Sequence, residues 1–456
     1  MGKMQKAKLA PDVSKEMLAA KFWLNNEDKR IIMNPAEIKA FNQATYQRAK
    51  RFGQEELFLN LEDYPEFLSI KSIKKIMDIE YKPAELEQKS YFDRHGKELS
   101  GAQKKMIIEN LNQADLEDEV RADRKVKFAV LIKRSSIKKY PTDIFLAADQ
   151  ISTDLDRNQL TALSVGTPCA VLAESRDQNW LFIQAKLYKG WVKKENTAFA
   201  QSKKEALSYL KSDRFLVVAE SRVETEPNPF AGDISNVLFQ MGDKIPLLKN
   251  EEIPDSLPEN NPQAQSAEGC YAVWLPTRSE AGNLEYKKAL LARSSDLNEG
   301  FLPYTRENII KEAFKLLGER YGWGGLFNRR DCSRFIMDIY RTVGIGLPRD
   351  SGAAQQKIAA GKIIEIRGDI KTRKSILNKL QAGDPLYMKG HAVMYLGERN
   401  GEHYLIHSAS GYSRETETKN IPVTVHGVFV MKAEQLLKNG ERTYLESFSL
   451  ARKFYI

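Results

Sequence analysis

The spacing of apolar residues changes twice along this chain, which rules out a single regular fold. Up to about residue 120 the apolar residues recur at helical spacing, and residues 34–37 (Asn-Pro-Ala-Glu) predict a helix start with Asn34 as N-cap. Short alternating strands follow to about residue 303, and helices and strands are mixed from residue 304. The 456 residues suffice for roughly two to four domains. We therefore expect an α+β multidomain protein.

The strand-rich middle of the chain contains two successive segments of the same kind. In the first, apolar strands containing Phe128, Val171 and Trp180 lead to Gly190-Trp191-Val192, with turn residues between them, as in a small β-barrel. The second segment repeats this pattern more weakly. The expected domains are a helical region, two β-barrels and a mixed α+β domain, at 1–120, 121–203, 213–303 and 304–456.

Charge and hydropathy narrow the classes of partner. The net charge is +9, but the basic residues are spread along the chain and mixed with acids, without a dense basic block interleaved with aromatics. This distribution of charge does not single out a nucleic-acid binder, because an anionic substrate or an anionic cell surface fits it equally well. No run approaches the ~18 apolar residues of a membrane span. The first residues also lack the apolar core of a signal peptide.

The three cysteines differ in their surroundings. Cys169 and Cys270 lie in apolar, strand-like runs and are interpreted as small buried hydrophobes. No C-x-x-C pair suggests zinc or redox chemistry. Cys332 begins a helical apolar pattern, and a helix N-terminus favours the thiolate and offers N–H groups to an oxyanion. The alternative is that Cys332 is a buried residue starting a core helix.

A cysteine nucleophile needs a base and a group that orients the base. His391 begins an alternating strand, and His407 lies on the strand that returns after residues 399–402. A two-residue Asn-Gly turn would pair Met394 with His407 and put the two histidines on opposite faces.

A three-residue loop at residues 399–401 would shift the register by one position. His407 would then lie opposite Val393, on the same face as His391. We predict this loop, because of the two registers only this one lets His407 orient His391. His403 would share the face, but it is too close to the turn to orient His391.

Several further stretches occur together with these residues. They are Tyr321-Gly-Trp-Gly-Gly, Asp331-Cys332-Ser333, Leu347-Pro348-Arg349-Asp350-Ser351 followed by Gln355, Gly383-Asp384, Gly390-His391-Ala-Val and Ile406-His407-Ser408. In this order they resemble the NlpC-type cell-wall peptidases, over about residues 304–456. The preceding chain resembles the subgroup with a helical N-terminal stabilising domain and two bacterial SH3-like domains.

The resemblance implies a papain-like catalytic domain with a Cys332/His391/His407 triad and no metal or cofactor. It implies hydrolysis, through a thioester, of the γ-D-glutamyl–diamino acid bond in peptidoglycan stem peptides with a free N-terminal L-Ala. Asp331 would bind the ammonium group of that L-Ala, with a helix N-cap as its alternative role. The other residues implied to line the site are Tyr321, Ser333 and Ser351, with Tyr188 contributed by the first SH3-like domain.

Two departures and three open points accompany this interpretation. Arg334 could meet an acidic substrate or face water, and the Lys/Arg-rich insertion Gly361–Leu380 could narrow the groove or change specificity. The alternatives in function are a wall amidase or transpeptidase of the same fold, or a non-catalytic wall-binding scaffold. The expected location is the periplasm or cell envelope, with the cytoplasm as alternative. A monomer acting on stem peptides or murein fragments is expected.

Overall fold

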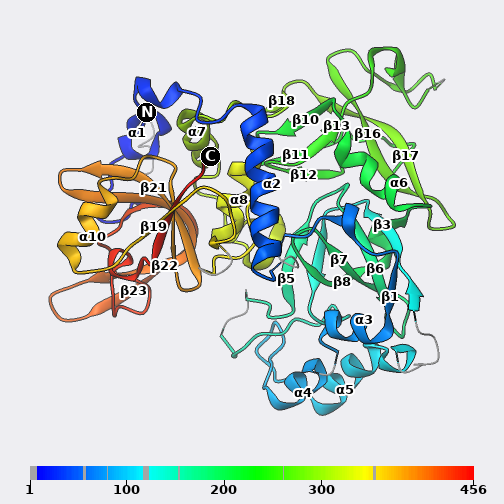
Figure 1. The fold of residues 1–456 in the computed structure, drawn as a ribbon, viewed down its shortest axis with the longest axis horizontal. Coiled ribbons are helices and arrows are strands. Elements are labelled where there is room, and N and C mark those ends of the chain that lie inside the picture. Colours follow the sequence, from blue (N-terminus) through cyan, green and yellow to red (C-terminus); the bar gives the residue numbers. More distant parts are fainter. Residues whose placement is uncertain are drawn as a thin grey trace, which may run out of the picture.

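The computed structural model describes residues 8–54, 58–79, 81–116, 123–151, 155–259, 261–352 and 356–455. It consists of a helical N-terminal part, a sheet-rich SH3-like middle and a C-terminal α+β domain (Figure 1). This is the α+β multidomain architecture expected from the sequence. The motif residue Gln355 and the first seven residues of the chain lie outside the described ranges. Among the described helices, none has both the length and the apolar character needed to cross a bilayer.

The N-terminal helices divide between two hydrophobic cores. α1 (Ala20–Trp23) and α2 (Pro35–Arg51) contribute buried side chains to the core of the C-terminal domain. α3 (Ile70–Met77), α4 (Tyr81–Gln88) and α5 (Gly101–Asn110) pack instead with the first SH3-like sheet. The first 120 residues therefore do not share one core.

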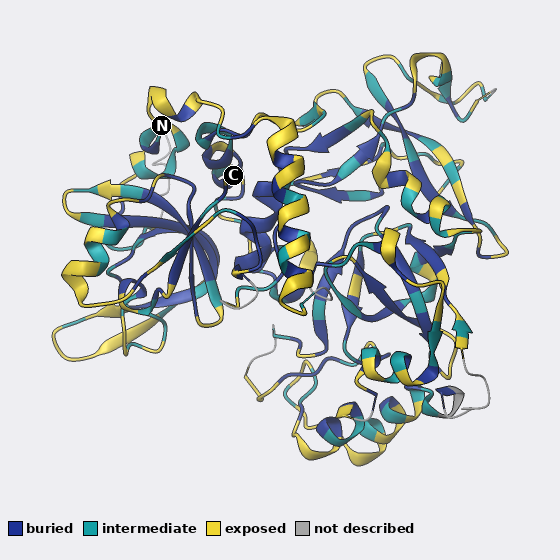
Figure 2. Cartoon of the chain, in the orientation of Figure 1, coloured by how far each residue is buried: buried dark blue, intermediate teal, exposed yellow. Residues whose placement is uncertain are grey.

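The cap predicted for the second of these helices is present. The Oδ1 of Asn34 accepts a hydrogen bond from the Glu37 N–H at 3.0 Å, and Pro35 is the first helical residue. α2 then runs along the boundary between the C-terminal domain and the SH3-like middle (Figure 1). Its solvent side is exposed along much of its length, and its other side is buried (Figure 2).

The first SH3-like region is a seven-stranded antiparallel sheet of order β5-β4-β8-β7-β6-β3-β9. The strands expected around Phe128, Val171, Trp180 and Trp191 are all present, and the rings of Phe182 and Trp191 meet edge to face at 5.5 Å. Cys169 is fully buried here, as expected. The strands are β3 (Lys127–Leu131), β4 (Ser135–Lys138), β5 (Gln159–Leu163), β6 (Pro168–Glu174), β7 (Trp180–Ala185), β8 (Lys189–Lys193) and β9 (Thr197–Phe199).

The second strand-rich segment is built from several small antiparallel sheets. β10 (Phe215–Val218) lies between β13 (Lys244–Pro246) and β18 (Leu297–Glu299). β11 (Arg222–Glu224) pairs with β12 (Leu238–Gln240), and β16 (Cys270–Arg278) pairs with β17 (Leu284–Ala292). Their inward side chains form a separate core, which includes Phe239 and Val273.

The C-terminal domain is a six-stranded sheet of order β19-β24-β20-β21-β22-β23. One face packs on α7 (Arg306–Lys315) and α8 (Cys332–Thr342), and α10 (Ile370–Leu377) packs against α11 (Tyr444–Ser447). α8 is buried on nearly all sides, because it lies between this sheet and the SH3-like regions (Figure 2). The strands are β19 (Lys362–Glu365), β20 (Pro385–Met388), β21 (His391–Arg399), β22 (Glu402–Glu415), β23 (Asn420–Lys432) and β24 (Leu450–Lys453).

Candidate active site

Cys332 is the first residue of α8, and Asp331 is the N-cap of that helix. The Oδ1 of Asp331 accepts a hydrogen bond from the Arg334 N–H at 2.9 Å. The backbone N–H groups of Ala392 and Ser333 lie near the Cys332 sulfur and act to lower its pKa. The sulfur is therefore held against the start of β21, next to His391.

Burial of the nucleophile opposes the thiolate that a helix N-terminus favours. Burial raises the pKa of Cys332 to about 12, and the negative charge of Asp331 adds to this increase. Burial also lowers the pKa of His391 to about 4. Desolvation therefore favours the neutral form of both Cys332 and His391.

The hairpin that carries the two histidines differs from the predicted one. Arg399 pairs with Glu402, so Asn400 and Gly401 form a two-residue turn, and both have positive φ (55° and 79°) as a type I′ turn requires. The prediction of a three-residue loop was wrong.

A β-bulge supplies the register shift that the turn does not. Tyr395 pairs with Leu405 and Gly397 pairs with Tyr404, so Leu396 is an extra residue on β21. Beyond the bulge Met394 lies opposite Ile406, which places Val393 opposite His407. His407 therefore lies on the same face as His391, as the predicted triad needs.

The rings of the two histidines are in hydrogen-bond contact. His391 Nε2 lies 2.8 Å from His407 Nδ1, and His407 Nε2 lies 3.1 Å from the Met431 Sδ. His407 is fully buried, with Phe429 and Tyr444 against its ring, and burial holds its pKa well below the ordinary value.

This chain of contacts fixes the tautomer of both rings. A thioether sulfur can only accept a hydrogen bond, so His407 carries its proton on Nε2 and accepts through Nδ1. His391 must then donate from Nε2, which leaves the lone pair of its Nδ1 available as a base. The arrangement suits removal of a proton from Cys332.

His403 does not take part in this arrangement. It lies opposite Glu398, and its Nδ1 is 2.9 Å from the Tyr395 hydroxyl. His403 was predicted not to orient His391, and its position near the turn agrees with that prediction.

The carboxylate of Asp331 is engaged by a residue that the sequence analysis did not assign to the site. Arg349 binds both oxygens of Asp331, with Nη2 to Oδ2 at 2.6 Å and Nη1 to Oδ1 at 3.1 Å. Arg349 Nη1 also donates to Ser333 Oγ at 2.9 Å, and its Nε donates to Thr161 Oγ1 of β5 at 2.7 Å. Burial alone would raise the pKa of Asp331, but Arg349 brings it below the ordinary value.

Comparison with known proteins identifies the family of the domain that carries these residues. Residues 318–424 match the NlpC/P60 family, and residues 144–193 match an SH3 domain of the SH3b1 type. The C-terminal domain is an NlpC/P60 domain. Members of this family are cysteine peptidases and hydrolases, which agrees with a Cys332 nucleophile and a histidine base. The family points to peptidoglycan as the substrate.

The fold likeness extends beyond the NlpC/P60 domain. A solved NlpC/P60 endopeptidase from Photobacterium damselae subsp. piscicida superposes with a TM-score of 0.69 at 16% identity, covering 91% of this chain and 90% of that chain. The helical and SH3-like regions are thus part of the shared fold. NlpC2 from Trichomonas vaginalis gives a TM-score of only 0.26 at 13% identity, covering 73% of this chain and all of that chain. A search of curated protein sequences found no match.

The glycine-rich stretch before the nucleophile packs on the first SH3-like region. Gly324 and Gly325 belong to η9 (Trp323–Asn328), where both have positive φ. A Cβ on Gly325 would lie 2.7 Å from the Cβ of Ala162, in β5. Gln159, also in β5, donates to the Gly324 carbonyl at 2.8 Å. The glycines therefore let this stretch of backbone approach the SH3-like sheet closely.

Arg334 neither faces water nor is available to a substrate. It is buried, its Nε lies 2.6 Å from Asp338 Oδ1, and its Nη1 donates to the Ala162 carbonyl at 3.0 Å. Both roles considered for Arg334 are therefore wrong, and the residue instead ties the nucleophile helix of the NlpC/P60 domain to β5.

The remaining predicted site residues lie at different depths around Cys332. The pKa of Tyr188 is raised to about 12 by burial and by the charges of Asp350 and Asp331, with Arg349 opposing, so this SH3-like residue is close to the Asp331 group. Tyr321 is half-buried at the start of the glycine stretch and donates its N–H to the His426 carbonyl at 2.8 Å. Ser351 is half-buried, and among the described residues no hydrogen bond links it to the Cys332 group.

Proposed function

We propose that this protein hydrolyses the γ-D-glutamyl–diamino acid bond of peptidoglycan stem peptides that have a free N-terminal L-Ala. The observation that supports this most strongly is the 2.8 Å contact of His391 with His407 at the strand next to the Cys332 helix start, with the carboxylate of Asp331 one residue before the nucleophile. An acyl-transfer site with an acidic group beside it suits a substrate whose amine lies a short, fixed distance from the scissile bond.

The acylation step follows from the tautomers of the two histidines. His391 Nδ1 takes the proton of the Cys332 thiol as the sulfur attacks the side-chain carbonyl of D-Glu. The oxyanion is held by N–H groups at the start of α8. The C–N bond then breaks, the leaving amine takes the proton from His391, and a thioester remains.

Deacylation uses the same base. His391 takes a proton from water, the resulting hydroxide attacks the thioester carbonyl, and the C–S bond breaks. The proton returns to the Cys332 sulfur, and the product leaves with a D-Glu γ-carboxylate. His407 keeps the His391 ring in place through both steps, because the 2.8 Å hydrogen bond restrains its rotation.

The amine end of the substrate would lie near Tyr188. Two carboxylates, Asp331 and Asp350, and one guanidinium, Arg349, act on the Tyr188 hydroxyl. The two carboxylates outnumber the one guanidinium, and this excess of negative charge favours a bound ammonium although Asp331 is paired with Arg349.

The test compares L-Ala-γ-D-Glu-diaminopimelate with its N-acetylated form, with products separated by chromatography. We expect cleavage between D-Glu and diaminopimelate, and a kcat/KM for the acetylated peptide that is lower by about 10- to 100-fold. Cys332→Ala should abolish cleavage of both. Equal cleavage of the two peptides would remove the requirement for a free amine. Cleavage at another bond, or ligation to an added amine, would favour the amidase or transpeptidase alternative.

A further inference from the structure

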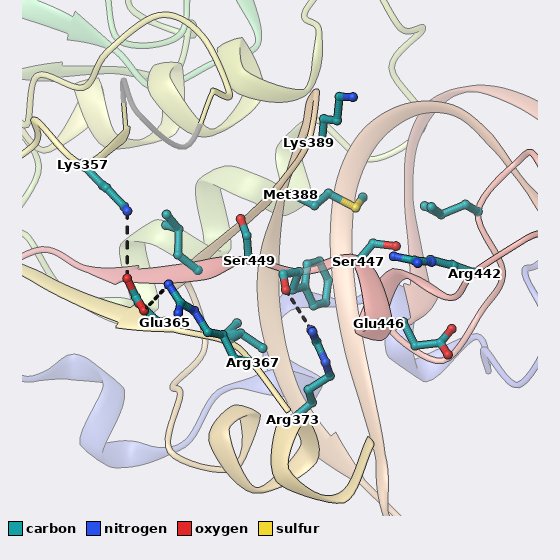
Figure 3. A pocket seen from close by; sticks show the side chains of 14 residues that line it. Lys357, Glu365, Arg367, Arg373, Met388, Lys389, Arg442, Glu446, Ser447 and Ser449 are labelled. Atoms are coloured by element: carbon teal, nitrogen blue, oxygen red, sulfur yellow. Dashed lines mark hydrogen bonds and ion pairs between the residues drawn. The ribbon is translucent and has the colours of Figure 1, made fainter. Parts of the chain in front are cut away.

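A cavity of about 550 Å³ opens at the end of β20, beside Met388 and Lys389 (Figure 3). Its walls come from the end of β20, from α11 and the start of β24, and from the segment joining β19 to α10. The last of these belongs to the insertion Gly361–Leu380, whose role the sequence left open.

The lining of this cavity is strongly basic. Five cationic side chains and two carboxylates, Glu365 and Glu446, take part in it. Glu365 is paired with Arg367 at 2.9 Å and lies 4.0 Å from Lys357. Glu446 accepts hydrogen bonds from the Thr443 N–H at 2.8 Å and the Thr443 hydroxyl at 2.9 Å. Both carboxylates therefore have partners, and the cationic excess is left to the cavity.

The donors offered to a ligand are the cations and not the hydroxyls. Ser447 Oγ donates to the Thr443 carbonyl at 2.8 Å, and Ser449 Oγ donates to the Tyr387 carbonyl at 3.0 Å. Lys389 and Arg442 are exposed, and neither lies within 4.0 Å of a carboxylate of the described residues, although the charge of Arg442 also acts on Glu446. In Figure 3 Arg442 lies beside Ser447, and Lys389 extends from the strand end next to Met388. Such a lining suits a carboxylate.

The cavity lies on the histidine side of the active site. Met388, which lines it, pairs directly with His391 in the β20–β21 hairpin, and directly opposed residues project from the same face of a sheet. Tyr444 begins α11, one wall of the cavity, and its ring centroid is 6.0 Å from that of His391. Asp331, Arg349 and Tyr188, at the amine end of the site, do not line the cavity.

The chemistry of the reaction relates this side to one half of the substrate. The group that deprotonates the nucleophile also protonates the leaving amine, so the leaving amine must lie next to His391. The leaving half of the stem peptide therefore departs toward the side on which the cavity opens.

We propose that the cavity is a subsite for the carboxylate of the leaving half, the diamino acid and any residue that follows it, bound through Lys389 and Arg442. This inference rests on the proposed function and extends it to the substrate beyond the scissile bond. The insertion Gly361–Leu380 would then select an anionic peptide end by completing the wall of the subsite.

The test uses the full-length protein and two peptides that differ in one group, L-Ala-γ-D-Glu-L-Lys and its C-terminal carboxamide. Wild type should cleave the acid with a kcat/KM about tenfold higher than the amide, the size expected for one charge-assisted contact. The double variant Lys389→Ala/Arg442→Ala should remove this preference by lowering kcat/KM for the acid alone.

The matched control is Lys371→Ala/Arg414→Ala, which removes two exposed cations that do not line the cavity. It should keep the preference, and Arg442→Lys should retain part of it. Equal cleavage of the acid and the amide by wild type, or an unchanged preference in the Lys389/Arg442 variant, would overturn the subsite and leave the proposed function intact. Failure of wild type to cleave either of these peptides or L-Ala-γ-D-Glu-diaminopimelate would overturn both.

Discussion

His391 and His407 share a hydrogen bond of 2.8 Å, and the next contact of His407 is the sulfur of Met431 at 3.1 Å. The histidine base is thus oriented by a second histidine that is itself held by an uncharged acceptor. Burial keeps His407 neutral, since its pKa is held well below the ordinary value. The ring that orients His391 is therefore neutral, and the charge that favours an imidazolium on His391 is that of the Asp331 carboxylate.

The orienting role of His407 predicts a selective loss of rate. His407→Leu should lower kcat by about 100-fold or more with little change in KM, because His391 loses the acceptor that fixes its tautomer. His407→Asn, whose side-chain carbonyl can accept from His391, should retain more activity. His403→Asn is the matched control, since His403 bonds only the Tyr395 hydroxyl in this hairpin, and it should alter the Tm without a comparable fall in kcat. Equal losses in kcat for the two positions would contradict the assignment.

Met431 should contribute to the rate through its sulfur. Met431→Leu conserves volume but leaves His407 Nε2–H without an acceptor, and we expect kcat to fall by about 5- to 10-fold at nearly unchanged KM. Met394→Leu makes the same change at a buried methionine in the core that packs on α7 and α8. It should leave kcat near that of wild type. If both variants lose activity to the same extent, the effect is one of packing and the tautomer argument fails.

The neutral resting pair predicts how the protein responds to pH. Burial lowers the pKa of His391 to about 4, so the acidic limb of kcat/KM should lie well below the ordinary histidine pKa of about 6.5. Between these two values the unfolded chain binds a proton that the folded protein excludes, so stability should fall as the pH drops from about 6.5 toward 4. His391→Gln should weaken that dependence in thermal unfolding.

Thiol alkylation measures the protonation state of Cys332, the partner of His391. Because burial raises the pKa of Cys332 to about 12, iodoacetamide should react slowly at neutral pH and faster as the pH rises. A plateau of rapid alkylation at pH 5 to 6 would indicate a resting thiolate–imidazolium pair and would contradict the neutral one.

The contact between the glycine stretch and β5 predicts a position-specific loss of stability. Gly325→Ala places a methyl group 2.7 Å from the Ala162 Cβ at a residue with positive φ, and it should cost about 2–4 kcal/mol. Gly300→Ala introduces the same φ penalty with no atom within 4 Å, and it should cost about 1 kcal/mol. Calorimetric unfolding of both variants measures the difference. A difference close to zero would show that η9 can move away from β5 at no cost.

The sequence was sufficient for the parts of the site that depend on local pattern. The helix beginning at Cys332 and the strand beginning at His391 follow from apolar periodicity, and the family motifs name both residues. The register of the hairpin was predicted for the wrong reason, because Asn400-Gly401 forms a two-residue turn and the shift comes from the bulge at Leu396. Leu396 is an ordinary strand residue, and the local signal for a bulge is only the glycine that follows it.

Long-range polar partners were beyond prediction from the sequence. Arg334 was expected to meet an acidic substrate or to face water, but it lies in the interior, paired with Asp338 and donating to the Ala162 carbonyl of β5. Arg349 was quoted as part of a motif without a role, and the structure pairs it with Asp331 and Thr161. Both interactions involve β5, roughly 170 to 190 residues earlier in the chain, which no local pattern brings near the nucleophile.

The hydrogen bonds from Arg349 and Arg334 to β5 have a consequence for modularity. An SH3-like unit that served only to target the enzyme could be exchanged or removed without altering turnover. Here it supplies the wall against which the nucleophile helix is braced. A fragment beginning at residue 304 would keep Asp338 and Asp331 for these arginines but lose the Ala162 carbonyl and the Thr161 hydroxyl, so transplanting the catalytic domain into a chimaera would require carrying β5 along with it.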